Sequence, residues 1–170
     1  MKRRVSVFLV VLLVLAVLAV AWARAYSLGA SNFASNGSPI SGWHWLRSSG
    51  HTATWTFDAG ALQGAKGVYI NLNPLVTNGT NGGSGYDTTV KYTIQGARTQ
   101  TGTITVVNPF RPTDPQNSGG LGYQAYGHSG TIPSTVYRGC SAVKVTISYP
   151  FPNGKHVAVN NGCMGIGYSK

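Results

Sequence analysis

The chain has 170 residues, of which only 9% are charged, and it carries a formal net charge of +10 at pH 7. Its basic residues are scattered along the sequence and form no run, which argues against a nucleic-acid-binding arm. The length is typical of a single domain with a proper hydrophobic core.

The first residues have the pattern of an export signal. A basic start (MKRR) precedes an apolar run, Val5–Ala23, and a small-residue site, Ala23-Arg24-Ala25. This pattern predicts a signal peptide over residues 1–25, cleaved before Tyr26. The apolar run is also close to the ~20 residues that span a bilayer, so an uncleaved anchor is the alternative. Both interpretations place the rest of the chain outside the cytoplasm, either secreted or at the cell surface.

Removal of residues 1–25 would leave a mildly basic domain. Nine Lys and Arg residues then remain against three aspartates and no glutamate, a formal charge of +6. The simplest interpretation of this charge is that the basic residues lie on a solvated surface. At most, the charge predicts a weak attraction to anionic polymers such as acidic wall glycans.

The chain contains two cysteines, Cys140 and Cys163. An even number of cysteines in an exported chain usually indicates a disulfide, so we expect these two to be joined. A metal site is disfavoured because there is no Cys-x-x-Cys spacing.

Five segments after residue 40 alternate apolar and polar residues with a period of two. This is the pattern of half-buried strands with threonine-rich outer faces. The sequence therefore predicts an all-β fold: an antiparallel two-sheet β-sandwich, jelly-roll-like, over residues 41–170. Residues 26–40 are predicted to be a polar N-terminal segment or an edge strand. The five segments are Thr52–Phe57, Gly67–Asn73, Thr88–Ile94, Thr103–Val106 and Ala142–Tyr149. We expect the two layers to meet over Trp55, Ile70, Tyr92 and Val145.

The last predicted strand should belong to a hairpin. Pro152-Asn153-Gly154 suits a three-residue turn and would set Tyr149 opposite Val157. In that register Cys163 does not face Cys140, so the predicted disulfide would need a bend before the strand.

Three tryptophans lie in the stretch SGWHWLRSSGHTATWTF, residues 41–57. Trp55 belongs to an alternating strand and is predicted to be in the core. Trp43 and Trp45 share one face, and we favour a core position that closes one end of the sandwich. The alternative is an exposed platform that stacks on sugar rings.

Two long connections, residues 76–87 and 108–126, are rich in Gly, Asn, Pro and Tyr. Loops of this length in a small domain are often functional. We therefore predict a ligand-binding edge formed by these loops and the two uncertain tryptophans. Its residues are Trp43, Trp45, Tyr86, Asp87, Arg111, Tyr123 and Tyr126.

No cofactor is predicted. The four histidines show no metal-ligand spacing. A weak calcium site near Asp87, with oxygens from Asn78, Asn81 and Ser84, is less favoured than a plain turn-rich loop. No Gly-x-Ser-x-Gly elbow is present, so a serine hydrolase is disfavoured.

The function favoured by the sequence is a secreted, non-catalytic module that binds a surface carbohydrate or similar extracellular polymer through its loop face. The first alternative is a structural subunit of an extracellular fibre or layer, assembled from copies of itself by strand exchange. A small secreted hydrolase is less favoured. It would need two of Asp58, Asp87 and Asp114, or one of them with His128, to meet in a cleft.

Overall fold

A computed structural model describes residues 25–76, 87–107, 123–149 and 156–170. The described chain is all-β with antiparallel pairing throughout, as predicted. Only short helical turns interrupt the strands. In chain order the elements are β1 (Ala25–Gly29), β2 (Asn32–Ser35), β3 (Ser38–Pro39), β4 (His44–Leu46), β5 (Thr52–Asp58), η1 (Ala59–Leu62), β6 (Lys66–Leu72), β7 (Leu75–Val76), β8 (Thr88–Gln95), β9 (Thr99–Val106), β10 (Tyr123–Gln124), β11 (Gly127–His128), α2 (Ser134–Tyr137), β12 (Ala142–Ser148), β13 (Val157–Val159), η4 (Asn161–Cys163) and β14 (Met164–Ser169).

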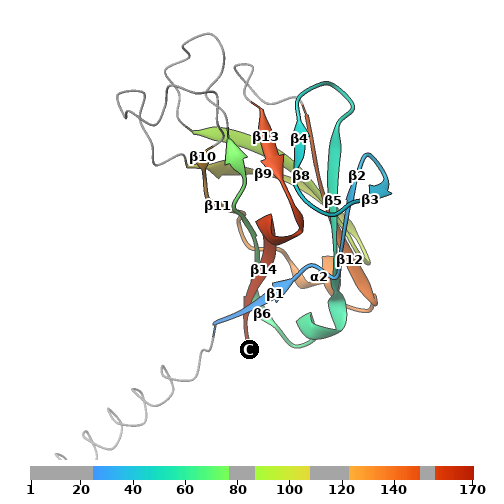
Figure 1. Cartoon of the computed structure of the whole chain (residues 1–170). Coiled ribbons are helices and arrows are strands. Elements are labelled where there is room, and N and C mark those ends of the chain that lie inside the picture. Colours follow the sequence, from blue (N-terminus) through green and yellow to red (C-terminus); the bar gives the residue numbers. More distant parts are fainter. Residues whose placement is uncertain (1–24, 77–86, 108–122, 150–155) are drawn as a thin grey trace, which may run out of the picture.

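The strands form three sheets around a shared core (Figure 1). One sheet has six strands in the order β3-β2-β5-β12-β8-β9. The other two have four strands each, in the orders β1-β14-β6-β11 and β10-β7-β13-β4. The arrangement is sandwich-like because the six-stranded sheet and the two smaller sheets contribute to one hydrophobic cluster.

All five strands expected from the period-two pattern are present, as β5, β6, β8, β9 and β12. Their apolar positions are buried and their alternate positions are more exposed. The four residues predicted to join the layers, Trp55, Ile70, Tyr92 and Val145, all belong to the core cluster. The alternation therefore identified both the strands and their inward faces.

The two four-stranded sheets are continuous with each other at a bend. β6 leads into β7 through Asn73-Pro74, and β13 leads into β14 through Asn160 and η4. Pro74 lacks an N–H group, which ends the regular ladder at that point. The Asn73 N–H donates across the bend to the Cys163 carbonyl at 2.8 Å. We call these two sheets together the bent sheet, and the segment Asn73–Pro74 with Asn160–Cys163 the crease.

The bent sheet is tied to the six-stranded sheet at one side. Val107, just after β9, forms an isolated bridge with Tyr126, and the two main-chain hydrogen bonds measure 2.8 and 3.2 Å. Beside it, Gly127 of β11 lies so close to β9 that an added Cβ would clash with the carbonyl oxygen of Thr105. Glycine is required there for the close approach of two backbones.

The predicted pairing of the C-terminal hairpin strands is wrong, while its predicted turn, Pro152–Gly154, lies outside the described residues. β12 pairs with β5 on one side and β8 on the other, so both of its edges are occupied. β13 pairs instead with β4 and β7 in the bent sheet. All three residues of β13 are buried, as expected of a strand between two neighbours and not of an amphipathic hairpin arm.

The predicted disulfide is also wrong: Cys140 and Cys163 are free thiols. Cys140 lies between α2 and β12, and its thiol donates to the Tyr137 carbonyl at 3.3 Å. Cys163 lies in the crease, where its sulfur accepts from the Asn160 N–H at 3.4 Å. Cys140 lies just before β12 of the six-stranded sheet and Cys163 lies just before β14 of the bent sheet, so the two cysteines flank strands of different sheets. Burial raises the pKa of the Cys163 thiol, which keeps it protonated.

The segment after the apolar N-terminus pairs within the domain. β1 runs along β14 from Ala25 to Gly29, and Tyr26 stacks on Tyr168 with ring centroids 5.3 Å apart. β2 pairs with β5 in the six-stranded sheet. Of the predicted signal peptide, residues 1–25, the structure describes only Ala25. Within the described ranges, no helix has the length and hydropathy needed to cross a bilayer.

Candidate functional site

Trp43 and Trp45 lie on the outer side of the bent sheet. Leu46 of β4 is fully buried, so strand alternation turns Trp45 outward, where it is half-buried. Trp43, just before the strand, is 49% exposed and outside the core cluster. The favoured core position is therefore wrong for Trp43. The reason is that only one side of β4 faces the core, and Leu46 occupies it.

Arg47 completes this surface. Its guanidinium carbon lies 4.8 Å from the centre of the Trp45 ring, a cation–π distance. Arg47 thus covers part of Trp45, whereas no described residue stacks on Trp43. We call Trp43, Trp45 and Arg47 the tryptophan ledge, and Trp43 is its most accessible ring.

Two histidines lie next to the ledge, His44 at the start of β4 and His51 in the turn that joins β4 to β5. The rings of His44 and His51 are 5.7 Å apart, and His51 Nδ1 lies 3.3 Å from the Arg47 N–H nitrogen and 3.2 Å from the Trp45 carbonyl oxygen. His44 Nε2 is buried without a hydrogen-bond partner. Burial lowers the pKa of His44, and the neighbouring His51 lowers it further, and both effects favour the neutral imidazole.

Strand pairing connects the tryptophan ledge to the crease across the bent sheet. Trp45 pairs with Ala158, and Ala158 pairs with Leu75 on the next strand. Leu75 pairs in turn with Gln124, whose side-chain amide donates to the Asn73 carbonyl at 2.7 Å. Residues 71, 73 and 75 alternate with the buried residues 70, 72, 74 and 76. Trp45, Leu75, Asn73 and Asn71 therefore lie on the same side of the bent sheet, with the buried Ala158 between Trp45 and Leu75.

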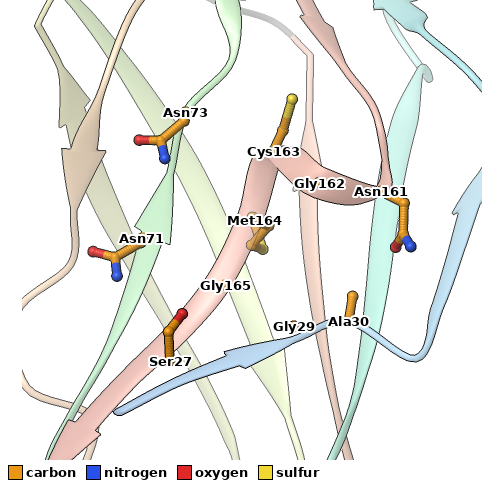
Figure 2. A pocket seen from close by; sticks show the side chains of 10 residues that line it. All are labelled: Ser27, Gly29, Ala30, Asn71, Asn73, Asn161, Gly162, Cys163, Met164 and Gly165. Carbon is orange, nitrogen blue, oxygen red and sulfur yellow. The ribbon is translucent and has the colours of Figure 1, made fainter. Parts of the chain in front are cut away.

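A pocket of about 390 Å³ opens on this surface beside the crease (Figure 2). The volume is within the range of about 300–1,000 Å³ common for small-ligand sites. In Figure 2, three asparagines and a serine are spaced around Gly165 at the start of β14. The lining residues are Ser27, Gly29, Ala30, Asn71, Asn73, Asn161, Gly162, Cys163, Met164 and Gly165.

The polar lining of this crease pocket is uncharged. The side chains of Asn71, Asn73, Asn161 and Ser27 form no hydrogen bond with any other residue that the structure describes. Cys163 is the one titratable lining residue, and burial raises its pKa. Three amides and one hydroxyl therefore offer donors and acceptors without a fixed charge.

At two glycines in the floor of the pocket, no side chain fills the space above the backbone. A Cβ added at Gly29 would meet nothing within 4 Å, and one at Gly165 would lie 3.4 Å from the Leu28 carbonyl oxygen. Further along β14, the Tyr69 ring lies against Gly167 and meets His128 edge-on at 6.2 Å. The outer face of this sheet thus combines backbone-lined space with an aromatic border.

The predicted ligand-binding residues are only partly brought together. Tyr123 is in β10 and Trp45 is in β4, at opposite edges of one four-stranded sheet. Three strand spacings, about 14 Å, separate them. Tyr126 is 56% exposed, but it lies at the side tied to β9 and not on the ledge. Asp87 directly precedes β8 on that side. Tyr86 and Arg111 lie outside the described residues.

The calcium-site and hydrolase alternatives need acidic groups that lie close together, and the described residues show no such group. Within the described ranges, no group of three His, Cys, Asp or Glu residues could hold a metal. The proposed calcium partners Asn78, Asn81 and Ser84 lie outside those ranges. Asp58 accepts from the Gly60 N–H at 2.8 Å and caps η1, while Asp114 is not described.

Comparison with known proteins adds no functional information: no protein family and no curated protein matches this sequence.

Sequence reasoning missed the crease pocket. One signal was available, because Tyr69 and Asn71 on the outer side of β6, and Asn73 just after it, stand where the other strands carry mainly threonine. Ser27 and Asn161 carried no comparable signal. They reach the pocket only because β1 and the crease pack beside β6.

Proposed function

We propose that this protein is a secreted, non-catalytic binding module, with a jelly-roll-like sandwich that recognises an extracellular polysaccharide. The binding surface is the outer face of the bent sheet and not the long loops. The observation that carries the proposal is the tryptophan ledge. It presents a half-exposed indole on the same side of the bent sheet as an uncharged polar pocket.

The chemistry of the ledge suits sugar rings. One face of a sugar presents C–H groups, which pack well on an indole, while its hydroxyls require polar neighbours. Trp43 supplies the flat apolar surface, and the exposed Arg47 supplies hydrogen-bond donors beside Trp45. A ring at this level of exposure contributes little to the core and leaves part of its apolar face open to a ligand.

The arrangement of β1 supports a discrete module over the fibre alternative. Strand exchange needs an N-terminal strand that leaves its own domain and an open groove where a partner strand would bind. β1 instead pairs with β14 of the same chain at five positions, and Leu28 packs on the core.

The test is isothermal titration of the mature protein with a panel of soluble neutral and acidic glycans. We expect one or more to bind, and Trp43→Ala to weaken that binding at least about ten-fold. Tyr126→Ala is the matched control, since it removes an equally exposed ring from the side tied to β9. Loss on Tyr126→Ala alone would place recognition on the loops, and no heat with any glycan would overturn the proposal.

A further inference from the structure

We propose that the crease pocket is a subsite for an uncharged sugar residue of the polymer that also contacts the tryptophan ledge. This inference rests on the proposed function and adds a ligand class to it: neutral polysaccharides and not acidic ones. The inference rests on three observations: the cavity, its uncharged amide lining and its glycine floor.

The pocket and the ledge are close enough for one chain to reach both. Asn161 is two residues beyond Val159, which pairs with His44 beside Trp45. On the neighbouring strand, Asn73 is two residues from Leu75, and two strand spacings, about 10 Å, separate Leu75 from β4. A short run of linked sugar rings can therefore place one ring at Trp43 and another in the pocket.

The lining selects hydroxyl groups over charged groups. Each asparagine amide carries both donors and acceptors, and each sugar hydroxyl does as well, so the two match in either direction. A carboxylate or sulfate in the pocket would find no Lys, Arg or His among the lining residues. An anionic residue would lose hydration there without gaining a charged partner.

This selectivity differs from what the overall charge predicts. A basic domain attracts acidic polymers through long-range electrostatics, and salt weakens that attraction. Hydrogen bonds from neutral amides and stacking on Trp43 respond little to salt. Ionic strength therefore separates a ligand held by the pocket from one held by the general positive charge.

The glycine floor allows the pocket to be filled without disturbing the fold. Gly29 lies in β1 with its Cβ direction open, and its backbone is not in the left-handed region. Gly29→Leu should project a side chain into the pocket space while β1 keeps its pairing with β14. Gly130 is the matched control, because an added Cβ there also meets nothing within 4 Å and the residue does not line the pocket.

The experiment measures the affinity of the mature protein for neutral and acidic hexasaccharides at low and high salt. We expect neutral ligands to be preferred, with affinity almost independent of salt. We also expect Gly29→Leu to weaken binding about ten-fold, an effect of about 1.4 kcal/mol, and Gly130→Leu to have no effect. Asn73→Asp, which adds a charge without changing shape, should also weaken the binding of neutral ligands. Thermal melts verify that each variant folds.

Each outcome is decisive. If Trp43→Ala abolishes binding while Gly29→Leu and Asn73→Asp bind like the wild type, the pocket is not a subsite and the proposed function stands. A preference for acidic ligands that disappears at high salt would overturn the neutral class. If the wild type binds neither ligand class, the proposed function fails along with this inference.

Discussion

The indole nitrogen of Trp55 donates a hydrogen bond to the main-chain carbonyl of Asn160, 3.0 Å away. Trp55 is fully buried in β5 of the six-stranded sheet, whereas Asn160 begins the crease of the bent sheet. Asn161, the next residue, lines the crease pocket. A core ring therefore holds in place the backbone that shapes the candidate site.

Trp55→Phe should lower the free energy of unfolding by about 2 kcal/mol, because it leaves a small cavity and an unpaired carbonyl in the interior. Trp43→Phe should change it by less than about 0.5 kcal/mol, since that ring is half-exposed. Urea denaturation measures both. Equal effects of the two substitutions would contradict the assignment of Trp55 to the core and Trp43 to the surface.

Gly127→Ala should be among the most damaging small substitutions in the domain. Its Cβ would clash with the Thr105 carbonyl, which is backbone and cannot rotate away. We expect a loss of about 3 kcal/mol, detected by chemical denaturation. Gly29→Ala, which enters open space, serves as the comparison. A wild-type unfolding midpoint for Gly127→Ala would show that β9 and β11 are not so closely packed.

Both cysteines should react with iodoacetamide in denaturant without prior reduction. Each thiol has its own local hydrogen bond, and burial raises the pKa of Cys163, which makes its thiolate scarce and its oxidation slow. Mass spectrometry counts the labels. Labelling that appears only after reduction would restore the disulfide predicted from the sequence.

Stability should decrease as the pH falls below the usual His44 pKa of 6.5. Burial lowers that pKa in the folded state, so the unfolded chain takes up a proton first and acid favours unfolding. The stabilising contribution is complete above pH 6.5 and is lost as the pH falls toward the lowered value. In melts between pH 7.5 and 5, His44→Leu should show a shallower decline in Tm than the wild type. The exposed His128→Gln is the control, and identical slopes for His44→Leu and the wild type would contradict this account.

The sequence predicted those parts of the fold that depend on local alternation. β5, β6, β8, β9 and β12 are long enough for a period of two to stand out, and their inward residues form the core. Short strands such as β4 and β13 leave too few residues for a pattern. Their partners depend on long-range pairing, which is why the C-terminal hairpin and the disulfide were mispredicted.

The candidate site was predicted only in part, for the same reason. The side of β4 that faces outward is decided by Leu46 and by pairing with β13, so the exposure of Trp43 could not be read from spacing alone. The crease pocket draws its residues from β1, β6 and the segment before β14, which are distant in sequence. Only the asparagines on the outer side of β6 could have been identified from the sequence pattern.

The most direct test of the central claim is a nuclear magnetic resonance titration of the labelled protein with a neutral oligosaccharide. We expect the Trp43 indole signal and the side-chain amide signals of Asn71, Asn73 and Asn161 to shift together, while signals of the exposed Lys91 and Thr103 on the six-stranded sheet stay in place. Shifts confined to the six-stranded sheet or to the long connections would contradict it.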